Sequence, residues 1–213
     1  MSKSSFPTAA AFLPKRRDLQ SLRTAAARCE GCPLFANATQ TVFGAGPATA
    51  RVMLIGEQPG DREDLAGEPF VGPAGQLLDR VLAEAGVPRK QVYVTNAVKH
   101  FKWTPRGKKR LHAKPSSREI SACHPWLEAE LEAVDPVMLV LLGATAAQAL
   151  LGPKFRITKQ RGQPFESEWS DWTLATYHPS AVLRAMTLPD GKQMLDDFTA
   201  DLRLVAKRLK KTA

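Results

Sequence analysis

Short apolar runs alternate with stretches of helical periodicity along most of this chain. Apolar, β-branched runs predict strands at residues 51–56, 92–98, 137–143 and 173–177, of which the first three are expected to be buried. Apolar positions at helical spacing predict helices at residues 18–28, 75–86, 117–134, 144–151 and 194–210. Strands that alternate with helices predict an α/β fold, in which helices cover both faces of a parallel sheet.

The pattern predicts one folded domain behind a tail. Residues 1–17 mix Ser, Pro, Ala and basic residues without periodicity, so we expect a flexible N-terminal tail. Residues 18–213 are expected to form a single domain, since 213 residues with 44% hydrophobic content suffice for one core. No extended apolar helix face suggests a coiled coil, and we expect a monomer.

Charge and cysteine content narrow the class of protein. The formal net charge of +9 attracts polyanions, which suits nucleic acid but equally suits acidic proteins or anionic lipid. No stretch approaches the roughly 18 apolar residues of a membrane span, so we expect no membrane contact and a cytoplasmic location. The three cysteines cannot all pair internally, which argues against a disulfide framework.

Polar residues follow several of the predicted strands. Ligands of parallel sheets bind beyond the carboxyl ends of the strands, so these loops are the expected site. A phosphate-binding loop is excluded because no Gly-Lys-Ser/Thr follows the first strand. A tight solvated turn remains an alternative for the first loop, and a satisfied polar residue remains one for the histidine of the last. The candidate residues in these loops are Gly56, Glu57, Gln58, Asp61, Asn96, His178, Ser180 and Arg184.

A basic stretch follows the second strand. Phe101 and Trp103 interleave with its cations, a combination that suits phosphates and stacked bases. A solvated, flexible charged loop is the alternative. The basic residues are Lys99, Lys102, Arg106, Lys108, Lys109, Arg110, Lys114 and Arg118.

The cysteines suggest a metal centre. Cys29 and Cys32 have the two-residue spacing that lets both thiolates reach one centre, and Cys123 supplies a third. His100 is the candidate fourth ligand, ahead of His124. A redox pair, two inert buried thiols and a zinc site remain alternatives.

Taken together, these residues resemble the uracil-DNA glycosylase superfamily, specifically its iron–sulfur family 4. The resemblance runs from about Cys29 to the C-terminal helix and rests on several motifs in one order. It implies a three-layer α/β/α sandwich with a central four-stranded parallel sheet. The motifs are Cys29-x-x-Cys32, residues 42–46, residues 56–61 with Glu63 and Asp64, residues 69–75, residues 93–100, residues 141–145, and His178-Pro-Ser180 with Arg184.

Two features resemble the UdgX branch of that family more closely. His100 occupies the position of the family's third cysteine, and a basic insertion ends at His112. The branch signature reads Lys-Arg-Arg-Ile-His, so this chain departs from it at Lys109 and Leu111. Both changes keep charge or bulk.

The resemblance implies a role for each candidate residue. It implies a structural [4Fe–4S] cluster on Cys29, Cys32, His100 and Cys123. Phe70 would stack on uracil, and the Asn96 amide would pair with its edge. His178 and backbone donors near Gln58 would hold the uracil oxygen, and Glu57 would favour the cationic sugar. The remaining expected substrate contacts are Gly56, Asp61, Arg110, Ser180 and Arg184.

The expected partner is uracil-containing DNA, with single strands favoured. In the UdgX interpretation, His112 attacks the sugar and leaves the protein covalently attached to DNA after uracil departs. The first alternative is a conventional glycosylase that turns over, with His112 contacting phosphate. The second is a DNA-binding module that breaks no bond, although a phosphate binder has no need of a base-reading pocket.

Overall fold

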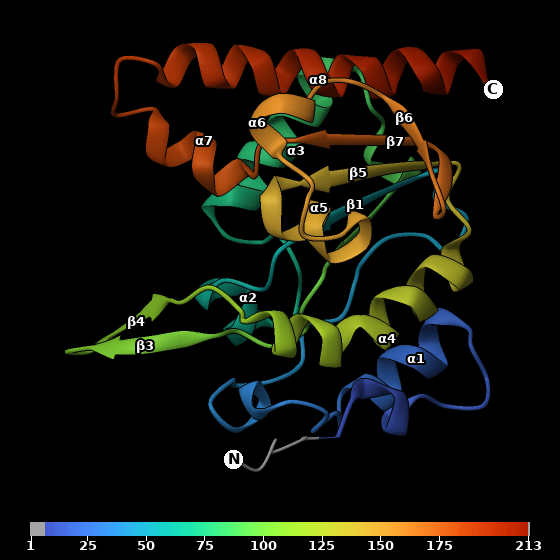
Figure 1. Ribbon diagram of the computed structural model, residues 1–213, viewed down its shortest axis with the longest axis vertical. Helices are drawn as coiled ribbons and strands as arrows, with labels where there is room; N and C mark the ends of the chain where they lie inside the picture. Colours follow the sequence, from blue (N-terminus) through green and yellow to red (C-terminus); the bar gives the residue numbers. More distant parts are fainter. Residues whose placement is uncertain (1–6, 213) are drawn as a thin grey trace.

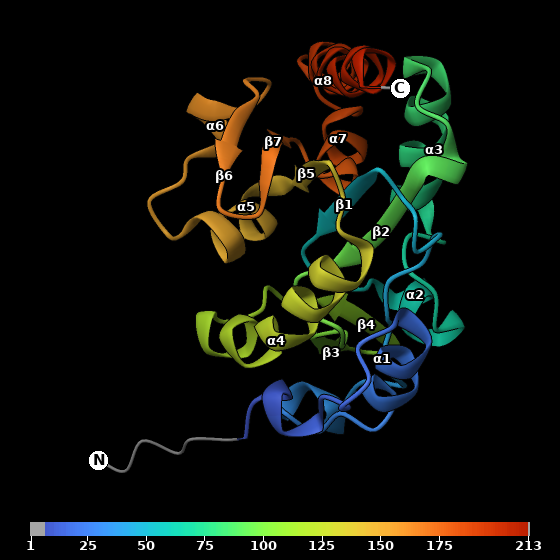
Figure 2. The ribbon, with the colours of Figure 1, turned by 90° about the vertical axis from the view of Figure 1, so that its right-hand side faces the viewer.

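A computed structural model describes residues 7–212 of the chain (Figures 1 and 2). Its central sheet has five strands in the order β2-β1-β5-β7-β6. Neighbours pair in parallel from β2 to β7, and β6 pairs antiparallel with β7. The strands are β1 (Val52–Gly56), β2 (Val92–Asn96), β5 (Met138–Leu142), β6 (Phe165–Ser167) and β7 (Ser170–Thr176).

The predicted parallel sheet is confirmed, but the predicted number of four strands is wrong. β6 adds a fifth strand at one edge. It has three residues, of which the first and last are half-buried and the middle one is exposed, so it carries no apolar run that sequence patterns detect. The parallel strands β1, β2 and β5 are buried at every position, as expected for strands covered on both faces.

Helices form a layer on each face of the sheet, which confirms the three-layer sandwich. Leu78, Val182 and Phe198 belong to the core on one face, under α3, α7 and α8, while Leu127 and Ala147 belong to the core on the other, under α4 and α5. The helices are α1 (Leu19–Ala26), α2 (Asp61–Ala66), α3 (Pro73–Ala85), α4 (Ser117–Val134), α5 (Gly143–Leu151), α6 (Ile157–Gln160), α7 (Pro179–Ala185) and α8 (Gly191–Lys211), with 3-10 helices η1 (Ala9–Phe12), η2 (Pro33–Ala36) and η3 (Arg89–Gln91).

The N-terminal segment packs beneath α4 (Figure 1). Of the expected tail, residues 1–6 lie outside the described residues. From there on the chain is in contact with the domain, because η1 packs against α4 and Ala9 is only 1% exposed. The folded part of the chain therefore begins before residue 18, and α1 follows with Asp18 as its N-cap.

The basic stretch after β2 contains a β-hairpin. Its strands β3 (Trp103–Arg106) and β4 (Lys109–His112) pair antiparallel, and Gly107 takes a left-handed conformation, with φ of 59°, in the turn between them. The hairpin projects from the body of the molecule beside α2 (Figure 1). Its last residue, His112, lies at the base of the hairpin opposite Trp103.

Four parallel strands end at one edge of the sheet. Gly56 at the end of β1 lies in register with Asn96 at the end of β2, and Leu142 at the end of β5 lies in register with Thr176 at the end of β7. The loops after these strands therefore meet, as expected for a parallel sheet. Among the described residues, none of the helices has the length and apolar character needed to cross a membrane.

Candidate active site

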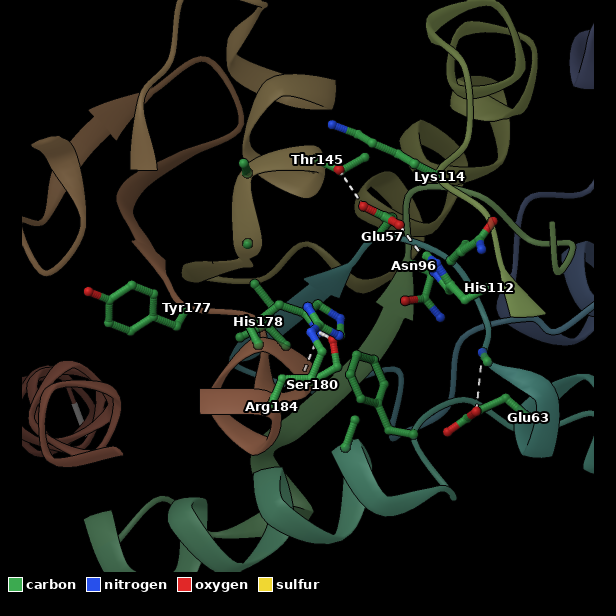
Figure 3. A pocket seen from close by; sticks show the side chains of 18 of the residues that line it. Glu57, Glu63, Asn96, His112, Lys114, Thr145, Tyr177, His178, Ser180 and Arg184 are labelled. Carbon is green, nitrogen blue, oxygen red and sulfur yellow. Dashed lines mark hydrogen bonds and ion pairs between the residues drawn. The ribbon is translucent and has the colours of Figure 1, made fainter. Parts of the chain in front are cut away.

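A cavity of about 710 Å³ opens at the carboxyl edge of the sheet (Figure 3). Eight of the residues expected to act on substrate line it, and they come from the loop after β1, the end of β2, the loop before α3, β4, and α7 with its N-cap. These are Glu57, Gln58, Phe70, Asn96, His112, His178, Ser180 and Arg184. The structure thus brings together residues that are up to 127 positions apart in the sequence, from Glu57 to Arg184.

Glu57 is held from two sides. One carboxylate oxygen accepts a hydrogen bond from the Thr145 hydroxyl, and the other lies 3.2 Å from His112 Nε2 (Figure 3). Burial raises the pKa of Glu57 and the hydrogen bonds from His112 and Thr145 lower it, and with the neighbouring charges the net effect holds its pKa below the ordinary value. Glu57 is therefore an ionised carboxylate at neutral pH.

His178 presents an N–H group to the same cavity. Its Nδ1 accepts hydrogen bonds from the Ser180 backbone, at 3.1 Å, and lies 2.8 Å from the Ser180 hydroxyl. Burial lowers the pKa of His178 to about 4 against the opposing effect of Glu57, so the ring is neutral at pH 7. A neutral ring with an accepting Nδ1 carries its proton on Nε2, and that atom faces Gly56.

Gly56 leaves space for the side chains that surround the cavity floor. A Cβ at this position would lie 2.4 Å from Asn96 Oδ1 and 2.8 Å from Phe70 Cζ, so any larger residue would displace them. Phe70 itself has a left-handed backbone, with φ of 59°, a strained conformation for an aromatic residue. Its ring lies 6.3 Å from the His178 ring at an angle of 29°.

Asn96 is 3% exposed, and its side chain points into the cavity. Within residues 7–212, its carboxamide makes no hydrogen bond to another side chain or to the backbone. Its donor and its acceptor are thus both free for a ligand.

Gln58, Asp61 and Arg110 have structural partners. The Gln58 side-chain amide donates to the backbone carbonyls of Lys102 and Ala113 at the base of the hairpin, and its oxygen accepts from the Lys102 backbone N–H. All three hydrogen bonds are 3.1 Å long. Arg110 forms ion pairs with Asp61 and Asp64, at 2.6 Å each, and neither Asp61 nor Arg110 lines the cavity. These contacts fasten the hairpin to β1 and α2.

The aromatic residues of the basic stretch pack within the protein. Phe101 is 1% exposed, and the Trp103 indole donates to the Asn37 carbonyl at 2.8 Å. The Arg110 guanidinium lies 5.5 Å from the Phe101 ring and 5.7 Å from the Trp103 ring. Because Phe101 is enclosed, its ring is not exposed for a base to stack on.

Sequence patterns did not indicate several residues that line the cavity. Thr145 lies at the start of α5 after β5, where the strand-end rule could have found it. Glu63 is 8% exposed, and its carboxylate accepts hydrogen bonds from the backbones of Gly60 and Gly72. Lys114 and Tyr177 also line the cavity; the sequence pattern placed Lys114 in the basic stretch and Tyr177 at the end of a strand, but it assigned neither to the site.

The three cysteines are free, buried and in one apolar cluster with Trp126. The Trp126 indole donates to Cys29 Sγ at 3.1 Å, and the Lys99 backbone donates to Cys123 Sγ at 3.2 Å. Burial raises the pKa of the Cys32 thiol, and it raises that of Cys123 to about 12.

His100 is buried near these residues. Its Nε2 lies 2.9 Å from the Thr41 hydroxyl, and burial lowers its pKa to about 4, which keeps the ring neutral. In the part of the chain that the structure describes, no group of three or more His, Cys, Asp or Glu is arranged to hold a single metal ion.

Fold and cavity together define a class: an α/β protein whose ligand site combines a carboxylate, a neutral histidine and a carboxamide at a sheet edge. The family model of the uracil DNA glycosylase superfamily matches residues 43–203, and the chain belongs to this superfamily. It is 40% identical to a type-4 uracil-DNA glycosylase of Thermotoga maritima over 172 residues, which are 80% of this chain and 86% of that protein.

Other relatives carry similar names. A type-4 uracil-DNA glycosylase of Archaeoglobus fulgidus is 35% identical over 84% of this chain and 87% of its own length. A type-5 uracil-DNA glycosylase of Thermus thermophilus is 33% identical over 65% of this chain and 68% of its own length. Similarity to the type-4 proteins therefore extends over most of both chains.

Proposed function

We propose that this chain excises uracil from DNA by cleaving the bond between the base and the sugar. The observation that carries the proposal is the meeting of an ionised Glu57, a neutral His178 and an unpartnered Asn96 amide in one cavity of a chain from this superfamily. The relatives named type-4 uracil-DNA glycosylase support the same reaction.

The cavity suits recognition of an extruded base. Uracil within a duplex must rotate out of the stack, and a single strand avoids that unpairing, so we take single-stranded DNA as the favoured substrate. Phe70 would stack on the ring, and the Asn96 amide would pair with the uracil edge. Cytosine presents the opposite donor and acceptor, and each mismatched group in such a site costs about 1–3 kcal/mol.

Cleavage separates opposite charges, and the cavity has a partner for each. The electrons of the broken carbon–nitrogen bond leave with uracil, and the His178 Nε2–H would stabilise the resulting anion as a hydrogen-bond donor. The sugar becomes electron-poor, and the Glu57 carboxylate would stabilise that positive charge. Burial keeps His178 neutral and Thr145 orients Glu57, so both groups are prepared before substrate binds.

Two candidate fates of the sugar follow, and the comparisons favour hydrolysis. A water molecule would add to the sugar carbon, giving an abasic strand and a free enzyme that turns over. The similarity to several proteins named type-4 uracil-DNA glycosylase supports this conventional reaction.

The position of His112 favours the second candidate, covalent capture as in the UdgX branch. The imidazole is half-exposed and lies on the cavity wall, with Nε2 3.2 Å from Glu57. A ring nitrogen would bond to the sugar carbon as the bond to uracil breaks, and the ring would then lose its proton, with Glu57 the nearest acceptor. The protein would then remain attached to the abasic strand.

One assay separates these fates. The protein is incubated with labelled single-stranded DNA containing uracil, and the products are run on a denaturing gel. Hydrolysis predicts an unshifted strand that alkali cuts. Capture predicts a shifted band that survives heat and detergent and contains one strand per protein. Peptide mapping should then find the modification on His112.

Variants sharpen the same assay. Under capture, His112→Ser loses the stable band and releases uracil repeatedly, because the smaller side chain admits water. Under hydrolysis it produces no such gain. His124→Ser is the matched control, since that ring lies outside the cavity beside Trp169. If the wild-type chain releases no uracil, either with or without a covalent adduct, excision itself is contradicted.

We propose further that Cys29, Cys32, Cys123 and His100 hold a [4Fe–4S] cluster. The buried thiols share one apolar cluster and receive N–H donors from Trp126 and Lys99, as ligand sulfurs of such clusters commonly do. A cluster spreads its ligands over four irons, so its ligands need not converge on one ion. When bound, it would link the N-terminal segment to α4 and would absorb at about 400 nm.

A further inference from the structure

Lys99 and Glu130 form a fully buried ion pair behind the cavity. Both side chains are 0% exposed, and the Lys99 ammonium donates to the Glu130 carboxylate. Its two other donors go to the Thr95 hydroxyl and to the backbone carbonyl of Asn96, at 2.7 Å each. All three ammonium protons are therefore used.

Glu130 is equally well satisfied. Its Oε1 accepts from the Gly44 backbone at 2.9 Å and from the Tyr93 hydroxyl at 2.8 Å, and Thr95 donates to both oxygens. The carboxylate on α4 thereby joins β2 to the segment that precedes β1. None of these groups takes part in the proposed chemistry.

Stability alone does not explain such a pair. Removing two charges from water is unfavourable, and replacing a buried pair with groups of similar volume is often neutral or stabilising. What the pair does provide is a fixed point, because its ammonium contacts the backbone of the residue that would read the base.

Asn96 depends on such fixation. Its carboxamide has no hydrogen-bond partner among the described residues, so its direction depends on the packing around it and on where the Asn96 backbone is held. Lys99 follows Asn96 by three positions, and its backbone N–H donates to Cys123 Sγ. Lys99 therefore lies between the cysteine thiols and the amide that would read the base. Lys99 therefore links the two sites through one side chain and one peptide group.

We propose that Lys99, with Glu130 as its counterion, is the positioning residue that fixes Asn96 for uracil recognition. The idea rests on the proposed function in assigning base reading to Asn96. Displacing a binding group by about 1 Å can reduce a rate by about a hundredfold, so a loosened Asn96 carbonyl has a measurable effect.

The test uses the full-length protein and the variant Lys99→Met/Glu130→Gln, which removes both charges and conserves volume. Tyr93→Phe is the matched control. It removes a hydrogen bond from the same carboxylate but leaves the bond from Lys99 to Asn96. Absorbance at about 400 nm shows whether the variants retain the proposed cluster.

Two readouts are compared. The first readout compares, for each variant, how strongly free uracil inhibits excision with how tightly the protein binds DNA that carries an abasic-site analogue. The second is the NMR spectrum after selective ¹⁵N-asparagine labelling, which gives signals only from Asn37 and Asn96. The spectrum reports on Asn96 whether or not the chain proves to excise uracil, so the two hypotheses can fail separately.

We expect the double variant to weaken uracil inhibition about tenfold, leave affinity for abasic DNA unchanged, and shift or broaden the Asn96 signals but not those of Asn37. Tyr93→Phe should lower only stability. Unchanged Asn96 signals in the folded double variant would overturn the proposal, as would an equal loss in Tyr93→Phe. If the double variant does not fold, Glu130→Gln alone must show the same changes at smaller size, and its failure to do so is equally decisive.

Discussion

At the scale of single residues, neighbours set the chemistry of Glu57 and His178 in opposite directions. Burial acts against the charged form of both, but only Glu57 receives enough hydrogen bonds to remain charged. The sequence placed both residues after strands and so predicted their meeting. It could not predict the tautomer of His178, which depends on the hydrogen bonds from Ser180.

The neutral, half-buried His178 predicts a pH-dependent stability. The unfolded chain takes up a proton on this ring near pH 6.5, whereas the folded chain does so only near pH 4. The free energy of unfolding should therefore fall as the pH drops from 6.5 towards 4, by up to about 1.4 kcal/mol per pH unit from this group. His178→Gln should remove this part of the slope.

Urea unfolding at several pH values measures the difference between the wild-type and variant slopes. The comparison matters because His100, whose pKa is also about 4, contributes a similar slope in both proteins when no cluster is bound. Identical slopes in the two proteins would show that His178 is not held neutral by burial.

At the scale of elements, the hairpin is the part that the sequence described least well. Its strands have four residues each and no apolar alternation, so neither period nor propensity indicates them. Contacts outside the hairpin stabilise it instead. Arg110 bridges to α2 through Asp61 and Asp64, and Asp64 is fully buried. The short helices α6 and α7 escaped prediction for the same reason of length.

Arg110→Gln should therefore release the hairpin from α2. It leaves the buried Asp64 without its cation, which we expect to lower stability by about 2–3 kcal/mol. Amide hydrogen exchange across Lys109–His112 should accelerate, and uracil excision should slow because His112 and the cavity wall lose their support. Lys109→Gln, which changes an exposed side chain of the same strand, should alter neither; equal exchange in the two variants would refute the bridge.

At the scale of the whole molecule, the order of strands and helices was predictable because buried parallel strands are continuous apolar runs. That order also predicted the edge at which the site lies, since parallel strands end together. The edge strand β6 and the packing of η1 were not predictable, because both depend on contacts with distant elements. Residue roles came from family resemblance, and the structure supplied the contacts that Gln58, Asp61 and Arg110 make.

The net charge of +9 and the rim residues Lys114 and Arg184 fit a polyanionic substrate, but the cavity floor must provide the selectivity. Asn96 is the residue there with a free donor and acceptor. Base choice should therefore depend on this one amide and not on the overall charge.

Measuring the free base released from single-stranded oligonucleotides that carry uracil, cytosine or thymine at one position tests this requirement most directly. The account predicts release of uracil alone, and a fall of about a hundredfold in Asn96→Ala with little change in affinity for abasic DNA. Release of no base by the wild-type chain, or equal uracil release by Asn96→Ala, would contradict it.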